Sequence, residues 1–347
     1  MNESWKRFLE DEGAIIENGR VVTFRDHANN LAGNGSRNML ADLSHFGLIR
    51  VSGSDALSFL HKQFINDVLG LPRHRSQLNG YCTPKGRLIA TFRLLHVGDG
   101  VMLLLPSTMT SLLTRRLKPY VFRDDVRFDD SSPDLIAIGY AGPDAAIALA
   151  AAVPEVPAGP GDVTDCGTIC VLRIPGRTPR FEMIGDVASL KALWKTLHTS
   201  VTDPVGASVW DALNIQSGTP IVYPETTELF LPQMINLDLI QGVSFKKGCF
   251  PGQEIVARTQ HRGQIKRRMY YAHVRIDAPP PPGAAVQGAE ESETGTIVAA
   301  ERSLTGPGVD LLAVLPIGSF ERTTLHLYDK DGPRIEERSL PYELTGN

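Results

Sequence analysis

The chain has 347 residues, of which 42% are hydrophobic and 21% are charged, as expected for a globular protein of more than one domain. Its net charge of −4 argues against a dedicated nucleic-acid binder, and it contains no apolar run of the length that spans a membrane. The acidic N-terminus (1–13) has no apolar segment of signal-peptide length, and four cysteines are too few for a disulfide scaffold. We therefore expect a cytoplasmic protein.

The first 38 residues are predicted to form an arm and a connector, because the tract 29–38 is rich in turn-forming residues. Order is predicted to begin at Ala41, and strands and helices then follow one another. The predicted strands are 46–51, 88–97, 101–105, 135–140, 168–174 and 180–184. The predicted helices start near Gly53, Ser107, Pro143, Asp186 and residue 206. A three-residue loop, 98–100, joins two of the strands in a hairpin. Hairpins mixed with helices indicate α+β architecture.

The pattern of apolar and polar residues changes from Tyr270 onward. Apolar and polar residues alternate over 270–276, which predicts a half-buried antiparallel strand. Four prolines, 279–282, form a stiff joint. Short strand-like runs near 294–300, 309–315 and 322–328 then predict a small all-β domain, a barrel.

The most unusual chemistry lies between residues 245 and 268. Cys249 precedes a helix predicted to begin at Pro251, and Lys246 and Lys247 stand just before it. A helix N-terminus and neighbouring ammonium groups both favour a thiolate, so we expect Cys249 to be the most reactive of the four thiols. The alternative is ordinary, because a lone cysteine is more often a buried apolar residue.

A basic run follows the cysteine in an otherwise acidic protein, and it suits a small anionic ligand or a local docking patch. Its members are Arg258, Arg262, Lys266, Arg267 and Arg268. Arg258 also stands four residues after Glu254, so the two can face the same side of the helix, as many surface pairs do. Among the other thiols, Cys82 lies next to a predicted turn and could compete with Cys249 in reactivity, whereas Cys166 and Cys170 are expected to be shielded by a strand. Their spacing has no second ligand pair, so no metal site is predicted.

Residues 228–268 resemble the signature of the YgfZ-type folate-binding protein family. The Lys-Gly-Cys-aromatic-x-Gly-Gln-Glu core at 247–254, followed by Val-Ala-Arg at 256–258, carries this resemblance most specifically. The tracts 42–45, 53–56, 66–68 and 295–298 resemble the wider aminomethyltransferase superfamily, which has the glycine-cleavage T-protein fold. The resemblance extends roughly from residue 40 to residue 345.

This resemblance implies an α+β fold of the T-protein type, a cloverleaf of two α+β domains plus a C-terminal β-barrel. The expected division is an arm at 1–38, a folate-binding region of two interleaved domains at 39–265 and a barrel at 266–347. Tetrahydrofolate would bind in the central hole. The residues expected to contact it are Lys247, Gln253, Glu254, Arg258 and Gln216, with Cys249 as a reactive thiol of undetermined role.

The chain departs from the T-protein pattern at two positions. The T-protein loop has an aspartate that assists one-carbon transfer, whereas the corresponding residues 85–90 here read Lys-Gly-Arg-Leu-Ile-Ala and include no carboxylate. A folate-contacting glutamate of the T-protein corresponds to Gln216. Without a carboxylate near the reacting amine, general acid–base help has no obvious source, and aminomethyl transfer is not expected.

The resemblance therefore implies an accessory factor for iron–sulfur cluster assembly or repair that uses a reduced folate and supports tRNA modification indirectly. Its partners would be folate and either iron–sulfur assembly factors or cluster-containing client enzymes, without direct contact to nucleic acid or membrane. Two alternatives stay open at this stage. One is a folate-dependent one-carbon transferase or demethylase of the T-protein type, and the other is a docking protein with a vestigial folate pocket.

Overall fold

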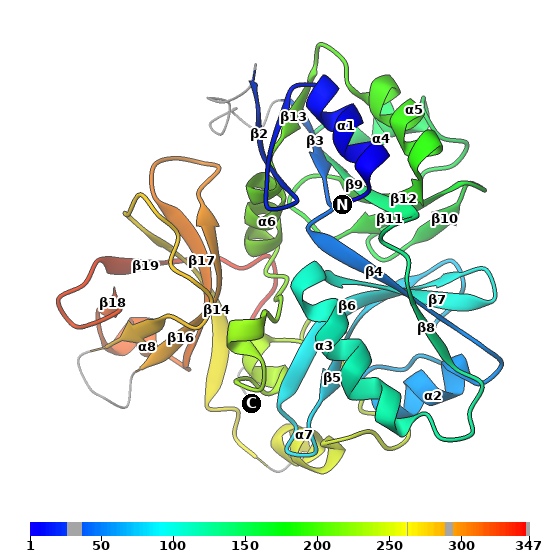
Figure 1. The fold of residues 1–347 in the computed structure, drawn as a ribbon. Coiled ribbons are helices and arrows are strands. Elements are labelled where there is room, and N and C mark those ends of the chain that lie inside the picture. Colours follow the sequence, from blue (N-terminus) through cyan, green and yellow to red (C-terminus); the bar gives the residue numbers. More distant parts are fainter. Residues whose placement is uncertain (26–36, 262, 289–293, 345–347) are drawn as a thin grey trace.

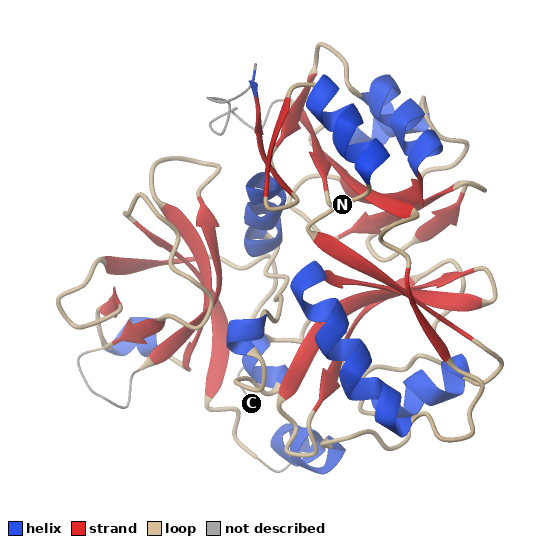
Figure 2. Cartoon of the chain, viewed as in Figure 1, coloured by secondary structure: helices blue, strands red, loops and turns tan. Residues whose placement is uncertain are grey.

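The computed structural model describes residues 1–25, 37–261, 263–288 and 294–344. Three lobes surround helix α6 (Ala207–Gln216): a six-stranded sheet lobe, a five-stranded sheet lobe and a closed β-barrel (Figure 1). Helices are concentrated in the two sheet lobes (Figure 2), so the expected α+β cloverleaf with a C-terminal barrel is confirmed. None of the described helices is long and apolar enough to cross a bilayer.

The six-stranded lobe is assembled from separate stretches of chain, in the strand order β10-β11-β12-β9-β3-β13. Its elements are β3 (Asn38–Asp42), β9 (Leu135–Ala141), α4 (Ala145–Ala150), β10 (Val163–Asp165), β11 (Ile169–Ile174), β12 (Arg180–Asp186), α5 (Val187–Leu197) and β13 (Thr202–Val205). Helix α5 forms where predicted, because the Asp186 carboxylate accepts a hydrogen bond from the backbone N–H of Ser189 at 2.9 Å and caps it. Its apolar stripe, which includes Trp194, is buried against the sheet.

The five-stranded lobe occupies the stretch of chain between β3 and β9, so the two sheet lobes are interleaved in sequence. Its strand order is β5-β6-β7-β4-β8. Its elements are β4 (Phe46–Ser52), α2 (Ala56–Gln63), β5 (Ser76–Cys82), β6 (Leu88–Val97), β7 (Gly100–Pro106), α3 (Ser107–Leu117), the 3₁₀ turn η3 (Lys118–Tyr120) and β8 (Arg127–Asp130). The predicted hairpin forms, but Val97 pairs with Gly100, so its loop has two residues rather than three.

The barrel is closed in the order β14-β17-β16-β15-β18-β19. Its elements are β14 (Arg267–Val274), β15 (Ala285–Gln287), β16 (Gly295–Arg302), β17 (Val309–Pro316), α8 (Ser319–Arg322), β18 (Leu325–Leu327) and β19 (Arg334–Arg338). The prediction of a half-buried strand at its start was wrong, because β14 is buried on both faces from Arg268 onward. Tyr270 and Ala272 face the barrel core, whereas Met269 and Tyr271 join the core of the five-stranded lobe.

The N-terminal residues do not form the arm that we expected. They fold into helix α1 (Glu3–Asp11) and a hairpin of β1 (Ala14–Glu17) and β2 (Arg20–Phe24), which pack on the six-stranded lobe. Trp5 is fully buried there, and its indole Nε1–H donates to the Asp42 carboxylate at 2.7 Å. The connector predicted at 29–38 falls largely on residues 26–36, outside the described part of the chain.

The segment between α6 and the barrel contains the sequence signature. It runs through the 3₁₀ turns η4 (Pro224–Thr226) and η5 (Pro232–Ile235) to helix α7 (Gln253–His261), close to the predicted helix start. Gly252, which precedes α7, has φ +82°, and a Cβ on it would lie 2.5 Å from the carbonyl oxygen of Thr83. Only glycine allows this close approach, which docks the start of α7 on the turn 83–87.

Candidate functional site

A cavity of about 400 Å³ lies where the three lobes meet around α6. Its walls come from the β1–β2 turn, the residues before β4, the helix α6 itself, the η4 segment and β16 of the barrel. The ionisable residues that line it are Arg20, His45, Asp211, Tyr223, Glu225 and Glu301. We call this space the central cavity. Its position agrees with the central hole that the resemblance implied.

Arg20 and Asp211 form the shortest ion pair among the described residues of the central cavity. The guanidinium Nη2 of Arg20, at the start of β2, donates to Asp211 Oδ2 at 2.6 Å, and Glu301 Oε2 lies 3.8 Å from the same nitrogen. His45 Nε2 lies 3.4 Å from the other carboxylate oxygen, Asp211 Oδ1, but outside hydrogen-bonding geometry. The N-terminal hairpin, α6 and the barrel thus contribute Arg20, Asp211 and Glu301, respectively, to this cluster.

The protonation states in this cavity follow from burial and from the neighbouring charges. Burial alone would raise the pKa of Asp211, but His45 and Arg20 outweigh it and hold the pKa of this carboxyl below its ordinary value. Burial raises the pKa of Glu301, and repulsion from Asp211 adds to this shift. Burial also raises the pKa of the Tyr223 phenol, which therefore stays protonated at neutral pH. The cavity thus combines an ionised carboxylate with a phenol donor.

Several buried polar atoms of the central cavity make no hydrogen bond to the described part of the chain, although two of them, His45 Nε2 and Asp211 Oδ1, lie 3.4 Å apart. Within the described residues, Asp211 Oδ1 and both ring nitrogens of His45 are buried and have no hydrogen-bond partner. A buried polar atom without a partner costs about 1–3 kcal/mol, and most such atoms in proteins are satisfied. A bound ligand with adjacent N–H donors would satisfy Asp211 Oδ1, so the arrangement favours a donor-rich ligand.

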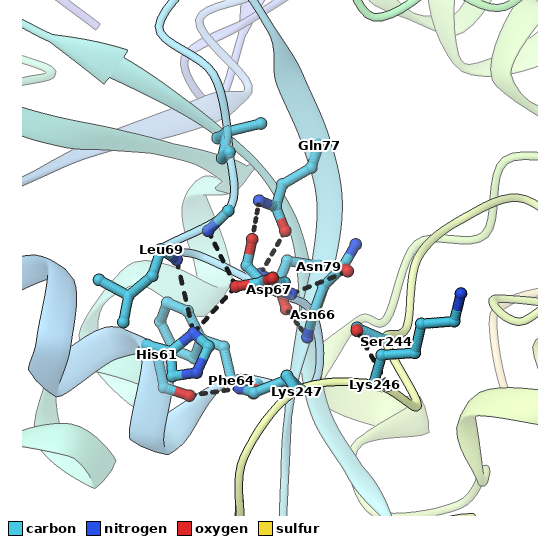
Figure 3. Close-up of polar contacts among 12 residues, drawn as sticks. His61, Phe64, Asn66, Asp67, Leu69, Gln77, Asn79, Ser244, Lys246 and Lys247 are labelled. Atoms are coloured by element: carbon cyan, nitrogen blue, oxygen red, sulfur yellow. Dashed lines mark hydrogen bonds and ion pairs between the residues drawn. The ribbon is translucent and has the colours of Figure 1, made fainter.

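The sequence signature itself forms a loop beside the end of α2 (Figure 3). Lys247 is buried, and its ammonium group donates to the carbonyl oxygens of His61 and Phe64. It also lies 5.2 Å from the centre of the Phe250 ring. Burial lowers the pKa of Lys247 to about 8. Lys247 is thus engaged with the protein backbone, whereas Lys246 is exposed.

Cys249 is exposed in this loop, four residues before the start of α7 at Gln253. The other thiols differ in their surroundings. Cys82, which we expected to compete with it, is instead 1% exposed, and burial raises its pKa. Cys170 is half-buried, and burial raises its pKa to about 12. The exposed position of Cys249 therefore leaves it the most accessible of the four.

The other predicted ligand residues lie apart from the central cavity. Glu254 and Arg258 are exposed on α7, and Gln253 and Gln216 are half-buried. None of these four, nor Lys247 or Cys249, is among the residues that line the central cavity. A second, more open groove of about 650 Å³ lies beside the signature loop and includes Lys246 in its wall.

The basic run is not one free patch. Arg268 is buried and holds both oxygens of Asp238, at 2.6 and 2.9 Å, as a two-pronged pair. Arg267 donates to the carbonyl oxygen of Thr294 at 2.8 Å. Arg262 lies outside the described residues. The expectation that the whole run serves an anionic ligand is therefore wrong for Arg268, which joins the η5 segment to the barrel.

The charged residues of the central cavity were missed by the sequence reasoning. His45 was noted only as the end of a tract that resembles the superfamily, and Asp211 was hidden inside a helix with an apolar pattern. Arg20 belongs to the stretch that we took for an arm. A charged residue within an otherwise buried helix is itself a signal, because a carboxylate in that position needs a partner.

Comparisons with known proteins were consistent across sequence and structure. A model of the GCVT N-terminal domain family matches residues 35–247. The tRNA-modifying protein YgfZ of Edwardsiella ictaluri (strain 93-146) is 31% identical over 298 residues, which cover 85% of this chain and 89% of that protein. The tRNA-modifying protein YgfZ of Yersinia pestis (strain Pestoides F) is 29% identical over 311 residues, with coverages of 88% and 93%.

One solved structure matches nearly the whole chain. The glycine cleavage system aminomethyltransferase T from Bartonella henselae superposes with a TM-score of 0.79, covering 98% of this chain and 97% of that one. The two sequences are 17% identical, so this likeness concerns the fold.

Proposed function

Since this chain belongs to the family of YgfZ-type tRNA-modifying proteins, with a GCVT N-terminal domain at its core, we propose that it binds a reduced folate in its central cavity. In this proposal it acts in the cytoplasm as an accessory factor for iron–sulfur cluster assembly or repair, and it supports tRNA modification indirectly. The observation that supports the folate assignment is the buried Asp211 carboxylate, whose Oδ1 makes no hydrogen bond among the described residues and lies 3.4 Å from His45 Nε2.

The residues of the central cavity fit the pterin ring of a reduced folate. That ring presents an amino group and a neighbouring ring N–H side by side, an arrangement that a carboxylate binds through two parallel hydrogen bonds. Asp211 would accept this pair, and Tyr223 would donate to a ring acceptor. Apolar contacts would come from Phe46 and Ile221, which also line the cavity. A volume of about 400 Å³ lies within the range of small-molecule sites.

The anionic glutamate tail of the folate needs a different environment. The central cavity is acidic, since Asp211, Glu225 and Glu301 outnumber Arg20. The tail would therefore leave the cavity, and the exposed Arg258 and Lys246 remain our candidates for attracting it. In this proposal Lys247 serves the site indirectly, by fixing the loop that presents its neighbours.

Cys249 is proposed to handle sulfur, iron or a redox partner transiently. Its exposure gives a client protein access to the thiol. One thiol does not hold an iron–sulfur cluster alone, because such clusters require four protein ligands or ligands shared between proteins. The partners of this protein are therefore proposed to be iron–sulfur assembly factors or cluster-containing client enzymes.

A second candidate function is folate-dependent one-carbon transfer or demethylation. Residues 85–90 lack the T-protein aspartate, but Asp211 and Glu301 bring two carboxylates into the central cavity from other elements. Such groups can serve as general acid or base. Formation of methylenetetrahydrofolate from an aminomethyl-carrier protein, or turnover of methylated amines, would favour this candidate over the accessory role.

The accessory role is tested by deleting the gene and measuring the activities of cluster-containing enzymes together with tRNA thiolation. We expect both to fall and the wild-type gene to restore them. Cys249→Ala should fail to restore them, whereas the matched control Cys166→Ala should succeed. If the deletion leaves both readouts unchanged, the accessory role is wrong.

A further inference from the structure

Arg20 reaches the central cavity from outside the matched family domain. The GCVT match begins at residue 35, whereas Arg20 opens strand β2 of the N-terminal hairpin. A tight turn precedes it, with Asn18 at φ 50° and Gly19 at φ 73°. The hairpin itself is closely packed, since a Cβ on Gly206 at the start of α6 would lie 2.1 Å from the carbonyl oxygen of Val22. These contacts hold the backbone that carries Arg20 in place.

The pair between Arg20 and Asp211 is incomplete. Only one guanidinium nitrogen contacts one carboxylate oxygen, and the Arg20 side chain is 39% exposed. The chain also contains a complete pair for comparison: Arg268 holds both oxygens of Asp238, and both side chains are 4% exposed. Two-pronged, buried arginine–carboxylate pairs are the stronger kind, and single exposed contacts are the weaker kind. The contact of Arg20 is therefore the easier of the two to displace.

We propose that Arg20 is an internal competitor for the pterin, so that ligand binding displaces its guanidinium from Asp211. This inference rests on the proposed folate function. At the pterin edge, the amino group and the ring N–H are bonded to the same carbon atom. This edge therefore presents the same pair of donors as a guanidine does. It is matched to the same carboxylate, and it would also donate to Asp211 Oδ1, which Arg20 does not contact and which lies 3.4 Å from His45 Nε2.

The displaced side chain has a second partner within reach. Glu301 Oε2 already lies 3.8 Å from Arg20 Nη2, so a small rotation exchanges one carboxylate for the other. This exchange keeps the guanidinium paired while Asp211 binds the ligand. Arg20 thereby lowers the apparent affinity of any ligand that must take its place on Asp211.

The first test is a calorimetric titration with 5-formyltetrahydrofolate. Arg20→Met keeps most of the apolar stem and removes the competing charge, and we expect it to bind the folate about three- to tenfold more tightly than the wild type does. Arg20→Gln serves as a second variant if the first does not fold. The matched control is Arg50→Met, which removes an arginine paired with Asp99 on the surface at 3.2 Å and should leave the affinity unchanged.

Each outcome of this titration has a distinct meaning. Weaker or unchanged binding by folded Arg20→Met or Arg20→Gln overturns the competitor role and leaves the folate assignment intact. If neither the wild type nor the variants bind the folate, the proposed function fails, and this inference about the pterin fails with it.

A second test does not require a folate. Methylguanidinium at millimolar concentration should raise the melting temperature of Arg20→Met, because it takes the vacated position on Asp211, and it should not raise that of the wild type or of Arg50→Met. An equal response of all three proteins would show that Asp211 does not select a guanidine-like edge, and the inference would be wrong.

Discussion

At the residue scale, Lys247 shows that recognising a motif does not determine where its side chains point. The sequence places two lysines before Cys249, and both were reasonable ligands for an anion. Only the direction of the side chains separates them: Lys246 is exposed, and Lys247 turns inward to the carbonyl oxygens at the end of α2 (Figure 3). The side chains of neighbouring loop residues can point toward solvent or toward the core, and a loop has no sequence periodicity that would predict which.

Replacing Lys247 by Met should lower the free energy of unfolding by about 1.5–3 kcal/mol, because the two carbonyl groups lose a charged donor. Chemical denaturation of the purified variant measures this. Lys246→Met is the matched control and should stay within about 0.5 kcal/mol of the wild type. Equal effects of the two substitutions would refute the structural role of Lys247.

The lowered pKa of Lys247 also predicts a pH dependence. This pKa is about 8 in the folded protein, against an ordinary value of 10.5, so between these values the unfolded chain binds more protons at this site. Stability contributed by this group therefore rises as the pH increases from about 8 to about 10.5. The difference in unfolding free energy between the wild type and Lys247→Met should grow over this range. A constant or shrinking difference would contradict the assignment.

Cys249 should be the fastest of the four thiols to react in the native protein near neutral pH. It is exposed, whereas burial raises the pKa of Cys82 and of Cys170 and keeps both as thiols. Alkylation followed by mass spectrometry resolves each site, and unfolded protein gives the reference rates. Should Cys170 be labelled as fast as Cys249, the idea of an accessible reactive thiol must be abandoned.

At the scale of elements, the sequence predicted those helices and turns that depend on a few neighbouring residues. The β6–β7 hairpin and helices α3, α5 and α6 formed near their expected bounds, because their turns, caps and apolar stripes are encoded over a few residues. Short strands such as β13 and β15 were missed, since three or four residues show little periodicity. Strand β14 was misjudged because its second face is covered by another lobe, which its own alternation does not reveal.

Helix α1 could have been predicted from the spacing of its apolar residues. Trp5, Phe8 and Leu9 are spaced three and four apart, and all three are buried on one face. Trp5→Ala should therefore destabilise the protein by about 3–5 kcal/mol. Trp5→Phe should cost less than that, because it keeps one packed aromatic ring, although it loses part of the indole volume and the N–H donor to Asp42.

Thermal and chemical unfolding of both Trp5 variants measure these effects. Val22→Ala, at a hairpin position that is 44% exposed, is the control and should be nearly neutral. If Trp5→Ala unfolds like the wild type, residues 1–25 are an arm after all.

At the scale of the whole molecule, the central cavity could not be predicted from the sequence. Its ionisable side chains include those at positions 20, 45, 211, 225 and 301, and only the interleaving of the lobes around α6 brings them together. The family resemblance located the hole but directed attention to the signature loop, whose residues do not line it. Local spacing in the sequence does not report contacts between distant segments, so the fold was predictable and the lining of the central cavity was not.

The most direct test of the central claim is a calorimetric titration of 5-formyltetrahydrofolate into the wild type, Asp211→Asn and the surface control Asp99→Asn. We predict one binding site in the wild type and in Asp99→Asn, and at least about tenfold weaker binding by folded Asp211→Asn, because the two-pronged contact to an ionised carboxylate is lost. Absence of binding by the wild type, or unchanged affinity of Asp211→Asn, would contradict a pterin site in the central cavity.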